Sequence, residues 1–229
     1  MKKSLLLTTV FLTTGLSAFA TSIAPSGTAL APLPGATFSG TGISNTEVEQ
    51  TTTSGGDTIT LGLTATQRYF NPALTDDGHG TFFATTGLNN GLGATPHSLG
   101  STWNFDYYIS LGDTSGAGYT VKLVYANNTT GASGTQNFGT FHTSGTVQDS
   151  QNLTFGPYAG DLSFDPLAAG VYGFELDVLN DAGAVVATTA INVNVRSVPD
   201  ASSTITLMGA GLAGLAAFGF KRNRFATAK

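Results

Sequence analysis

Residues 101–113, STWNFDYYISLGD, alternate between large apolar and polar side chains more regularly than any other stretch. The apolar positions are Trp103, Phe105, Tyr107, Ile109 and Leu111, and the positions between them are Asn104, Asp106, Tyr108 and Ser110. A period of two is typical of a β-strand that buries one face. We therefore expect a strand with Trp103 and its companions in the core and Asp106 and Tyr108 on the opposite face.

The same alternation recurs on both sides of this stretch. Strands are expected in 57–65 (DTITLGLTA), 118–128 (GYTVKLVYANN), 135–143, 151–158, 170–180 (GVYGFELDVLN) and 184–195 (AVVATTAINVNV). A further short strand is expected around Phe82 and Phe83, between two stretches rich in turn formers. The turn formers in 112–118 predict a hairpin between 101–113 and 118–128, and Asn180-Asp181-Ala182-Gly183 predicts another between the last two strands. No segment of the body has the period of an amphipathic helix.

The composition agrees with an all-β fold. Charged residues make up only 10% of the chain, against about 25% in ordinary domains, and glycine is abundant at 30 residues. Short strands separated by turn signals favour a β-sandwich over residues 55–196. Residues 21–54 are rich in Pro, Gly, Ser and Thr and predict an extended or loosely ordered lead-in. The absence of cysteine rules out disulfides and a cysteine nucleophile.

The charges are distributed unevenly. All 14 acidic residues lie between Glu47 and Asp200, where Arg68, Lys122 and Arg196 are the three basic residues, so this span carries a net charge of −11. A body this acidic repels a phosphate backbone, and we expect no nucleic-acid partner.

The first 20 residues resemble an export signal. Lys2 and Lys3 precede an apolar stretch from Leu5 to Leu16, and the small residues Ala18 and Ala20 fit a cleavage site after Ala20. An uncleaved anchor is the alternative, but the apolar run is short for a span of ~20 residues. We expect a signal peptide over 1–20 and a mature, exported chain from Thr21.

The chain ends in the sequence RSVPDASSTITLMGAGLAGLAAFGFKRNRFATAK, residues 196–229. Ile205–Phe220 contains no charge, and residues 203–220 predict a single transmembrane helix. The basic residues Lys221, Arg222 and Arg224 follow at once and are typical of the cytoplasmic side. A core helix is the alternative, although the run is apolar on every face.

This ending resembles the PEP-CTERM class of sorting signals, most closely its VPDSG-type variant. The resemblance rests on the motif residues Val198, Pro199, Asp200, Ser202, Ser203 and Thr204, followed by the apolar helix and the basic tail, over 197–229. The motif departs from the class in having Pro199-Asp200 rather than Pro-Glu-Pro, and Ala201-Ser202 where the variant usually has Ser-Gly or Gly-Gly. The stretches 101–111 and 164–195 are also similar to uncharacterised passengers of such proteins.

The resemblance implies a substrate of an exosortase, a membrane-embedded transpeptidase of Gram-negative bacteria. Such a protein is held transiently in the inner membrane, is cut near the proline motif, and moves to the cell surface or the extracellular matrix. The class is associated with exopolysaccharide production, which makes exopolysaccharide a candidate partner.

Candidate sites within the body are few. Asp76-Asp77-Gly78-His79 is either a divalent-cation site or a polar turn, and the spacing of an EF-hand loop is missing. His97 and His142 are isolated. Two carboxylate pairs, Glu47/Glu49 and Asp161/Asp165, could be imagined as glycosidase residues. Asn127 and Asn152 begin N-glycosylation patterns or mark turns, and Tyr108 is the better surface aromatic for stacking on a sugar.

No nucleophile-elbow, zinc-protease or phosphate-loop motif occurs. We therefore expect a non-enzymatic passenger with no catalytic residue, metal or cofactor. Two alternatives stay open. An exposed row of aromatic rings would indicate a carbohydrate-binding or adhesive module, and a cleft with convergent carboxylates or histidines would indicate a secreted hydrolase.

Overall fold

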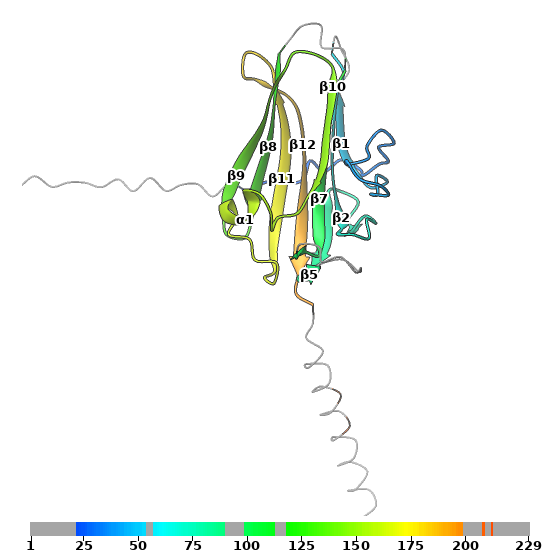
Figure 1. Cartoon of the computed structure of the whole chain (residues 1–229), viewed down its shortest axis with the longest axis vertical. Helices are drawn as coiled ribbons and strands as arrows, with labels where there is room; N and C mark the ends of the chain where they lie inside the picture. The colour runs from blue at the N-terminus through cyan, green and yellow to red at the C-terminus, as the bar shows by residue number, and fades with distance from the viewer. Residues whose placement is uncertain are drawn as a thin grey trace, which may run out of the picture.

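The strand Trp103–Leu111 is an inner strand of one sheet of a two-sheet sandwich (Figure 1). The computed structural model describes residues 22–53, 57–89, 99–112 and 118–198, together with Met208 and Leu212. The first sheet has the order β1 (Glu49–Thr53), β2 (Ile59–Gln67), β7 (Trp103–Leu111) and β10 (Gly145–Gln151). All of its pairings are antiparallel.

The second sheet faces the first and has six strands. Its order is β3 (Thr75–Asp76), β4 (Thr81–Thr85), β12 (Val185–Arg196), β11 (Gly170–Leu179), β8 (Tyr119–Asn127) and β9 (Ser133–Phe141). The β4–β12 pair is parallel, and the others are antiparallel. A two-stranded ribbon, β5 (Leu88–Asn89) with β6 (Gly100–Ser101), and a single helical turn, α1 (Tyr158–Asp161), complete the described elements. The expected all-β class is confirmed.

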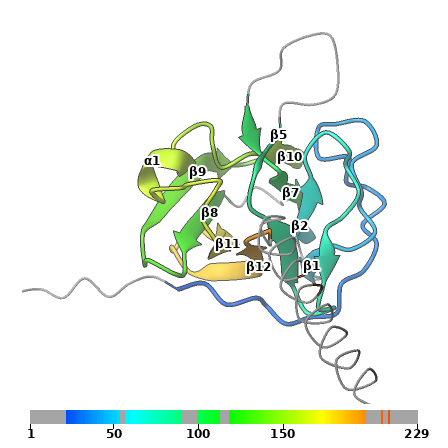
Figure 2. The same ribbon diagram turned by 90° about the horizontal axis from the view of Figure 1, so that it is seen from below.

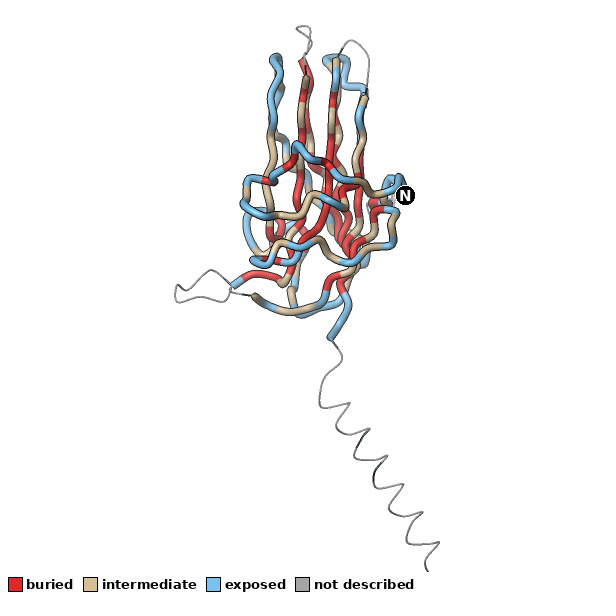
Figure 3. Tube along the Cα trace, turned by 90° about the vertical axis from the view of Figure 1, so that its right-hand side faces the viewer, coloured by how far each residue is buried: buried red, intermediate tan, exposed pale blue. Residues whose placement is uncertain are grey.

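Aromatic side chains from both sheets fill the space between them. Phe105 stacks on Phe174 with ring centroids 4.2 Å apart, and Trp103 packs against Tyr172 at 5.9 Å. Tyr158 of α1 closes one side by packing edge-on against Phe105 at 5.3 Å. Buried positions therefore run along the strands, while the exposed ones gather at turns and loops (Figure 3).

One of the two predicted hairpins is confirmed and the other is wrong. β11 and β12 pair as expected, and the Asn180 side chain accepts hydrogen bonds from the backbone N–H groups of Ala182 and Ala184 in the turn. β7 and β8 do not pair, because β7 lies between β2 and β10 and β8 lies in the opposite sheet. Both strands turn an apolar face to the same core, and alternation alone does not distinguish strands that pair from strands that face each other.

The strand expected over 151–158 is also placed wrongly. β10 spans Gly145–Gln151, and the chain turns at Asn152 before entering α1. Asn152 is buried, and its side chain holds this turn by accepting hydrogen bonds from the N–H and hydroxyl of Thr154. The apolar residues Leu153 and Tyr158 enter the core from the turn and the helix.

The lead-in over 21–54 is packed rather than loose. Its described residues form turns and bends and, before β1, little regular secondary structure, but Leu33, Ala36, Phe38 and Val48 form a small buried cluster. Its last residues form β1, which pairs with β2. The start of the segment lies against the second sheet, where Ser26 N donates to Ala190 O, and the rest lies outside β1 and β2 (Figure 2). The outward face of the first sheet is therefore partly covered, and Asp106 on this face is fully buried.

The predicted signal peptide and most of the predicted sorting signal lie outside the described residues. This applies to the signal peptide over 1–20, to Pro199–Thr204, and to the helix over 203–220 except Met208 and Leu212, which are helical and exposed. Among the residues that are described, no helix is long and apolar enough to cross a membrane.

Candidate functional site

The Asp76–His79 segment forms a polar turn. Asp76 Oδ1 accepts a hydrogen bond from Gly78 N at 2.8 Å, and Asp77 Oδ1 accepts from His79 N at 2.8 Å and Thr81 N at 3.0 Å. Slight burial of the Asp77 carboxylate raises its pKa, but the hydrogen bonds from the backbone N–H groups of Thr81 and His79 outweigh this effect. The pKa of Asp77 is therefore lowered. In the described part of the chain no group of three acidic or histidine side chains is arranged to hold a metal.

The carboxylates considered for glycosidase chemistry have structural partners. Glu49 is fully buried beneath the lead-in, and its Oε1 accepts a hydrogen bond from Thr28 N at 3.1 Å. Burial raises the pKa of Glu49. Asp161 accepts a 2.6 Å hydrogen bond from the hydroxyl of Tyr125, and Asp165 accepts one from Leu167 N at 2.8 Å. Neither pair lines a cavity described here.

Both asparagines of the glycosylation patterns are buried. Asn127 Oδ1 accepts hydrogen bonds from Thr129 N and Thr130 N, which fixes the turn after β8. The Asn152 amide nitrogen donates to Ser101 O, Trp103 O and Asn104 Oδ1. The turn interpretation of both sites is therefore confirmed.

Tyr108 is not an open stacking platform. Its ring is half-buried against the cluster formed by Leu33, Phe38 and Val48. Its hydroxyl lies so close to Gly35 of the lead-in that a Cβ there would be 3.3 Å away. Trp103 and Tyr107 are in the core as expected. Of the isolated histidines, His142 is exposed and His97 lies outside the described residues.

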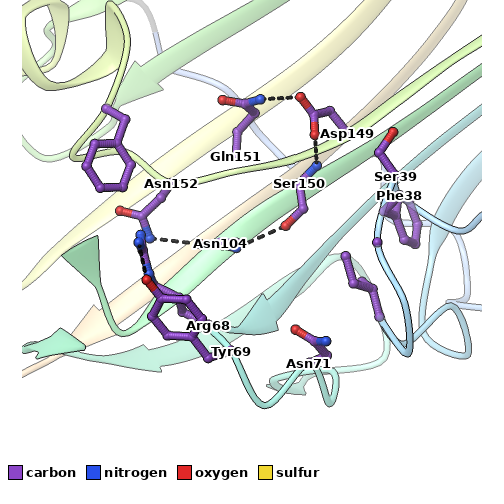
Figure 4. Close-up of a pocket in the computed structure, with 13 residues that line it drawn as sticks. Phe38, Ser39, Arg68, Tyr69, Asn71, Asn104, Asp149, Ser150, Gln151 and Asn152 are labelled. Atoms are coloured by element: carbon purple, nitrogen blue, oxygen red, sulfur yellow. Dashed lines mark hydrogen bonds between the residues drawn. The ribbon is translucent and has the colours of Figure 1, made fainter. Parts of the chain in front are cut away.

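A polar cavity of about 440 Å³ opens where the lead-in, the turn after β2 and the end of β10 meet (Figure 4). We call it the Arg68 cavity. Its lining comes from four separate parts of the chain: Phe38, Ser39, Gly40 and Ile43; Arg68, Tyr69 and Asn71; Asn104; and Asp149, Ser150, Gln151, Asn152 and Phe155. A second cavity of about 340 Å³, between β4 and the β5–β6 ribbon, has no charged residue in its described lining.

Arg68 forms one wall of the Arg68 cavity. Its guanidinium carbon lies 4.6 Å from the ring centroid of Tyr69 and 5.0 Å from that of Phe155. Its Nη2 donates a 2.8 Å hydrogen bond to the Tyr69 hydroxyl. Cation–π contacts on two rings hold the guanidinium in place. The side chain crosses Gly100 so closely that a Cβ there would lie 1.9 Å from Nη1.

A chain of hydrogen bonds forms the floor of the cavity (Figure 4). Asn152 Nδ2 donates to Asn104 Oδ1 at 2.8 Å, and Asn104 Nδ2 donates to Ser150 Oγ at 3.0 Å. Ser150 is paired across the sheet with Asp106, whose Oδ2 accepts a 2.7 Å hydrogen bond from Thr66. Burial raises the pKa of Asp106 to about 7, against opposing hydrogen bonds from Ser150 and Thr66.

Several residues that line the cavity have an unusual backbone conformation with positive φ. Five residues other than glycine have positive φ in the described part of the chain, and four of them line this cavity: Phe38 (48°), Ser39 (56°), Tyr69 (68°) and Asn71 (62°). Asparagine adopts this conformation readily, but for bulky residues it raises the conformational free energy by about 1–3 kcal/mol. Strain of this kind concentrates at binding and catalytic sites, so the observation singles out this cavity.

The sequence alone does not predict this cavity. Each of its four segments looks like an ordinary turn or strand end, and only the fold brings them together. The adjacent aromatic residues Tyr69 and Phe70, in a segment otherwise rich in turn formers, were the one available signal.

The predicted sorting motif is described only at its first residue. β12 ends at Arg196, whose guanidinium carbon lies 4.2 Å from the ring centroid of Phe83. Ser197 and Val198 follow outside the strand, and 56% of Val198 is exposed. Neither a protein-family model nor a curated protein matches this chain.

Proposed function

We propose that this chain is an exported surface or extracellular-matrix protein of a Gram-negative bacterium, processed near its C-terminus by an exosortase-type transpeptidase. One structural observation supports this most. The last strand ends at Arg196, and after the exposed Ser197 the sorting motif begins at Val198, which is also exposed. Pro199 disfavours a helical conformation at Val198, and proteases bind an extended backbone.

The remaining support is the order of segments in the sequence. In this proposal, residues 1–20 direct export, 203–220 hold the chain transiently in the inner membrane, and Lys221, Arg222 and Arg224 keep the tail in the cytoplasm. The exosortase acts on Pro199 and its neighbours outside the membrane. The sandwich between the two ends acts without catalysis.

Substitution of Pro199 tests the processing step. We expect Pro199→Ala, expressed in the native host, to leave most of the protein in the inner-membrane fraction, because the motif is impaired. Pro34→Ala, which changes an exposed proline of the lead-in, is the matched control and should be released like the wild type. Release of Pro199→Ala at the wild-type level would contradict recognition of this motif.

The Arg68 cavity favours a second candidate function for the passenger, a carbohydrate-binding or adhesive module. Small-molecule sites are concave, mix apolar and aromatic walls with a few fixed polar groups, and measure about 300–1,000 Å³. The cavity matches this description in its volume and in placing polar groups beside the rings of Tyr69 and Phe155. A hydrolase has less support, because glycosidases commonly use two carboxylates and Asp149 is the one carboxylate in the described lining.

A further inference from the structure

We infer that the Arg68 cavity binds the end or a branch of a neutral oligosaccharide. The inference deepens the carbohydrate-binding candidate and rests on it, whereas it is independent of the proposed sorting. It depends on four properties of the cavity: exposed aromatic rings, oxygen acceptors, a rigid floor and a balanced charge.

Two aromatic rings are presented at the cavity instead of being buried. Tyr69 and Phe155 are each 38% exposed, although aromatic side chains of this fold mostly lie in the core. They flank the Arg68 guanidinium, which fixes both of them. Aromatic rings held in this way offer apolar surface at low entropic cost, and the C–H faces of a sugar ring are the apolar part of an otherwise polar ligand.

The polar lining offers hydrogen-bond acceptors. The Asn71 amide nitrogen donates to Thr41 O at 3.1 Å, and the Gln151 amide nitrogen donates to Asp149. The amide oxygens of the same two side chains, Asn71 Oδ1 and Gln151 Oε1, are hydrogen-bond acceptors in the lining. The Asp149 carboxylate adds acceptor capacity beyond its bonds to Gln151 and Ser150 N. A lining of this kind suits the hydroxyl donors of a sugar.

The floor is organised before a ligand arrives. Asn152 is buried and uses its amide fully: the two N–H groups of Nδ2 are shared among Ser101 O, Trp103 O and Asn104 Oδ1, and Oδ1 accepts from Ser101 N and Thr154. The positive φ values of Phe38, Ser39 and Tyr69 require support from the surrounding fold. A site that is already ordered avoids part of the entropic cost of binding.

The charges favour a neutral ligand over an acidic one. Arg68 and Asp149 balance each other within the described lining. The body around them carries a net charge of −11 between Glu47 and Asp200, which repels polyanions. A uronate-rich polysaccharide is therefore disfavoured even though an arginine is present.

Calorimetric titration of the full chain tests the inference. The protein is kept in a polyoxyethylene detergent, because detergents with sugar headgroups would compete. The probes are cellotetraose, maltotetraose, xylotetraose and chitotetraose, with tetragalacturonate as the acidic probe, each up to about 10 mM. We expect saturable binding of at least one neutral tetrasaccharide and none of tetragalacturonate.

Three variants then locate the site. Phe155→Ala should weaken binding about tenfold through the loss of stacking, and Gln151→Met should weaken it several-fold through the loss of one acceptor. Phe70→Ala is the matched control, because Phe70 is 52% exposed beside Tyr69 but does not line the cavity. It should bind as the wild type does. Near-UV circular dichroism checks that each variant is folded.

The outcomes separate the alternatives. No saturable binding to any neutral probe overturns both the cavity as a glycan site and the carbohydrate-binding candidate on which it rests. Binding of tetragalacturonate alone overturns the neutral class. Binding of a neutral probe that is unaffected by both cavity variants keeps a carbohydrate-binding function but places it elsewhere. None of these results alters the processing expected from the Pro199→Ala experiment.

Discussion

Asp106 shows how one buried residue links the stability of this fold to pH. The alternation of β7 assigns it to the outward face, yet the lead-in and its neighbours remove it completely from solvent. Its Oδ2 accepts from Thr66, while Oδ1 has no hydrogen-bond partner in the described structure. Desolvation and the nearby Asp149 disfavour its charged form, and its pKa rises from 3.8 to about 7.

A pH-dependent loss of stability follows. Because the pKa is higher in the folded state, folding favours the protonated carboxyl, and this stabilisation is complete below about pH 4 and lost as the pH rises through about 7. Between pH 5 and pH 8 we expect the free energy of unfolding to fall by about 2–3 kcal/mol. Urea unfolding at several pH values measures this change.

Asp106→Asn should remove most of that pH dependence, because the amide does not titrate. A smaller decrease should persist at low pH, since burial also raises the pKa of Glu49 and Glu175. An unchanged pH profile in Asp106→Asn would show that another group is responsible.

Gly100 supports the position of Arg68 by having no side chain. A Cβ at this position would lie 1.9 Å from Arg68 Nη1 and 2.9 Å from Asn152 Oδ1. We expect Gly100→Ala to displace the guanidinium and lower the free energy of unfolding by about 1–3 kcal/mol. Gly145→Ala is the control, because a Cβ there meets nothing within 4 Å. Equal denaturation midpoints for the two variants would contradict the close contact.

At the scale of elements, the lead-in is part of the sandwich. Phe38 is completely buried in a cluster with Leu33, Ala36 and Val48. Phe38→Ala should therefore cost about 3–5 kcal/mol in unfolding free energy, as for other buried phenylalanines. Leu167→Ala, at a position that is 65% exposed, should change it little. A small effect of Phe38→Ala in thermal or chemical unfolding would mean that the lead-in is loosely attached.

The elements also show which features a sequence pattern can predict. The strands β2, β7, β8, β11 and β12 follow from alternation, and the β11–β12 hairpin follows from the asparagine and glycine of its turn. Pairing between distant strands does not follow, so β7 and β8 were wrongly joined. The packing of the lead-in does not follow from its sequence either, because its buried residues are spaced irregularly among prolines and glycines, without the period of a helix or strand.

The Arg68 cavity was beyond prediction for a related reason. Asn152 and Tyr69 are separated by more than half of the body, and only the pairing of β10 and β2 with β7 brings them to one end of the sheet. The backbone strain at Phe38 and Tyr69 cannot be deduced from residue types, because bulky side chains normally avoid positive φ.

At the scale of the whole molecule, the proposed route and the proposed binding site are separate properties. The cavity lies at the first sheet, whereas the sorting motif begins after the last strand of the second sheet. The acidic body and the basic residues near both ends of the sequence agree with a body exported from the cytoplasm and a retained basic tail. Cleavage near Pro199 would release the sandwich without disrupting any described strand.

The intact mass of the mature protein, isolated from the native host, tests the central claim most directly. The account predicts a product that begins at Thr21 and ends near Pro199, without the apolar segment and basic tail. A mature product that still contains Lys229 would contradict processing by an exosortase and indicate a permanent anchor instead.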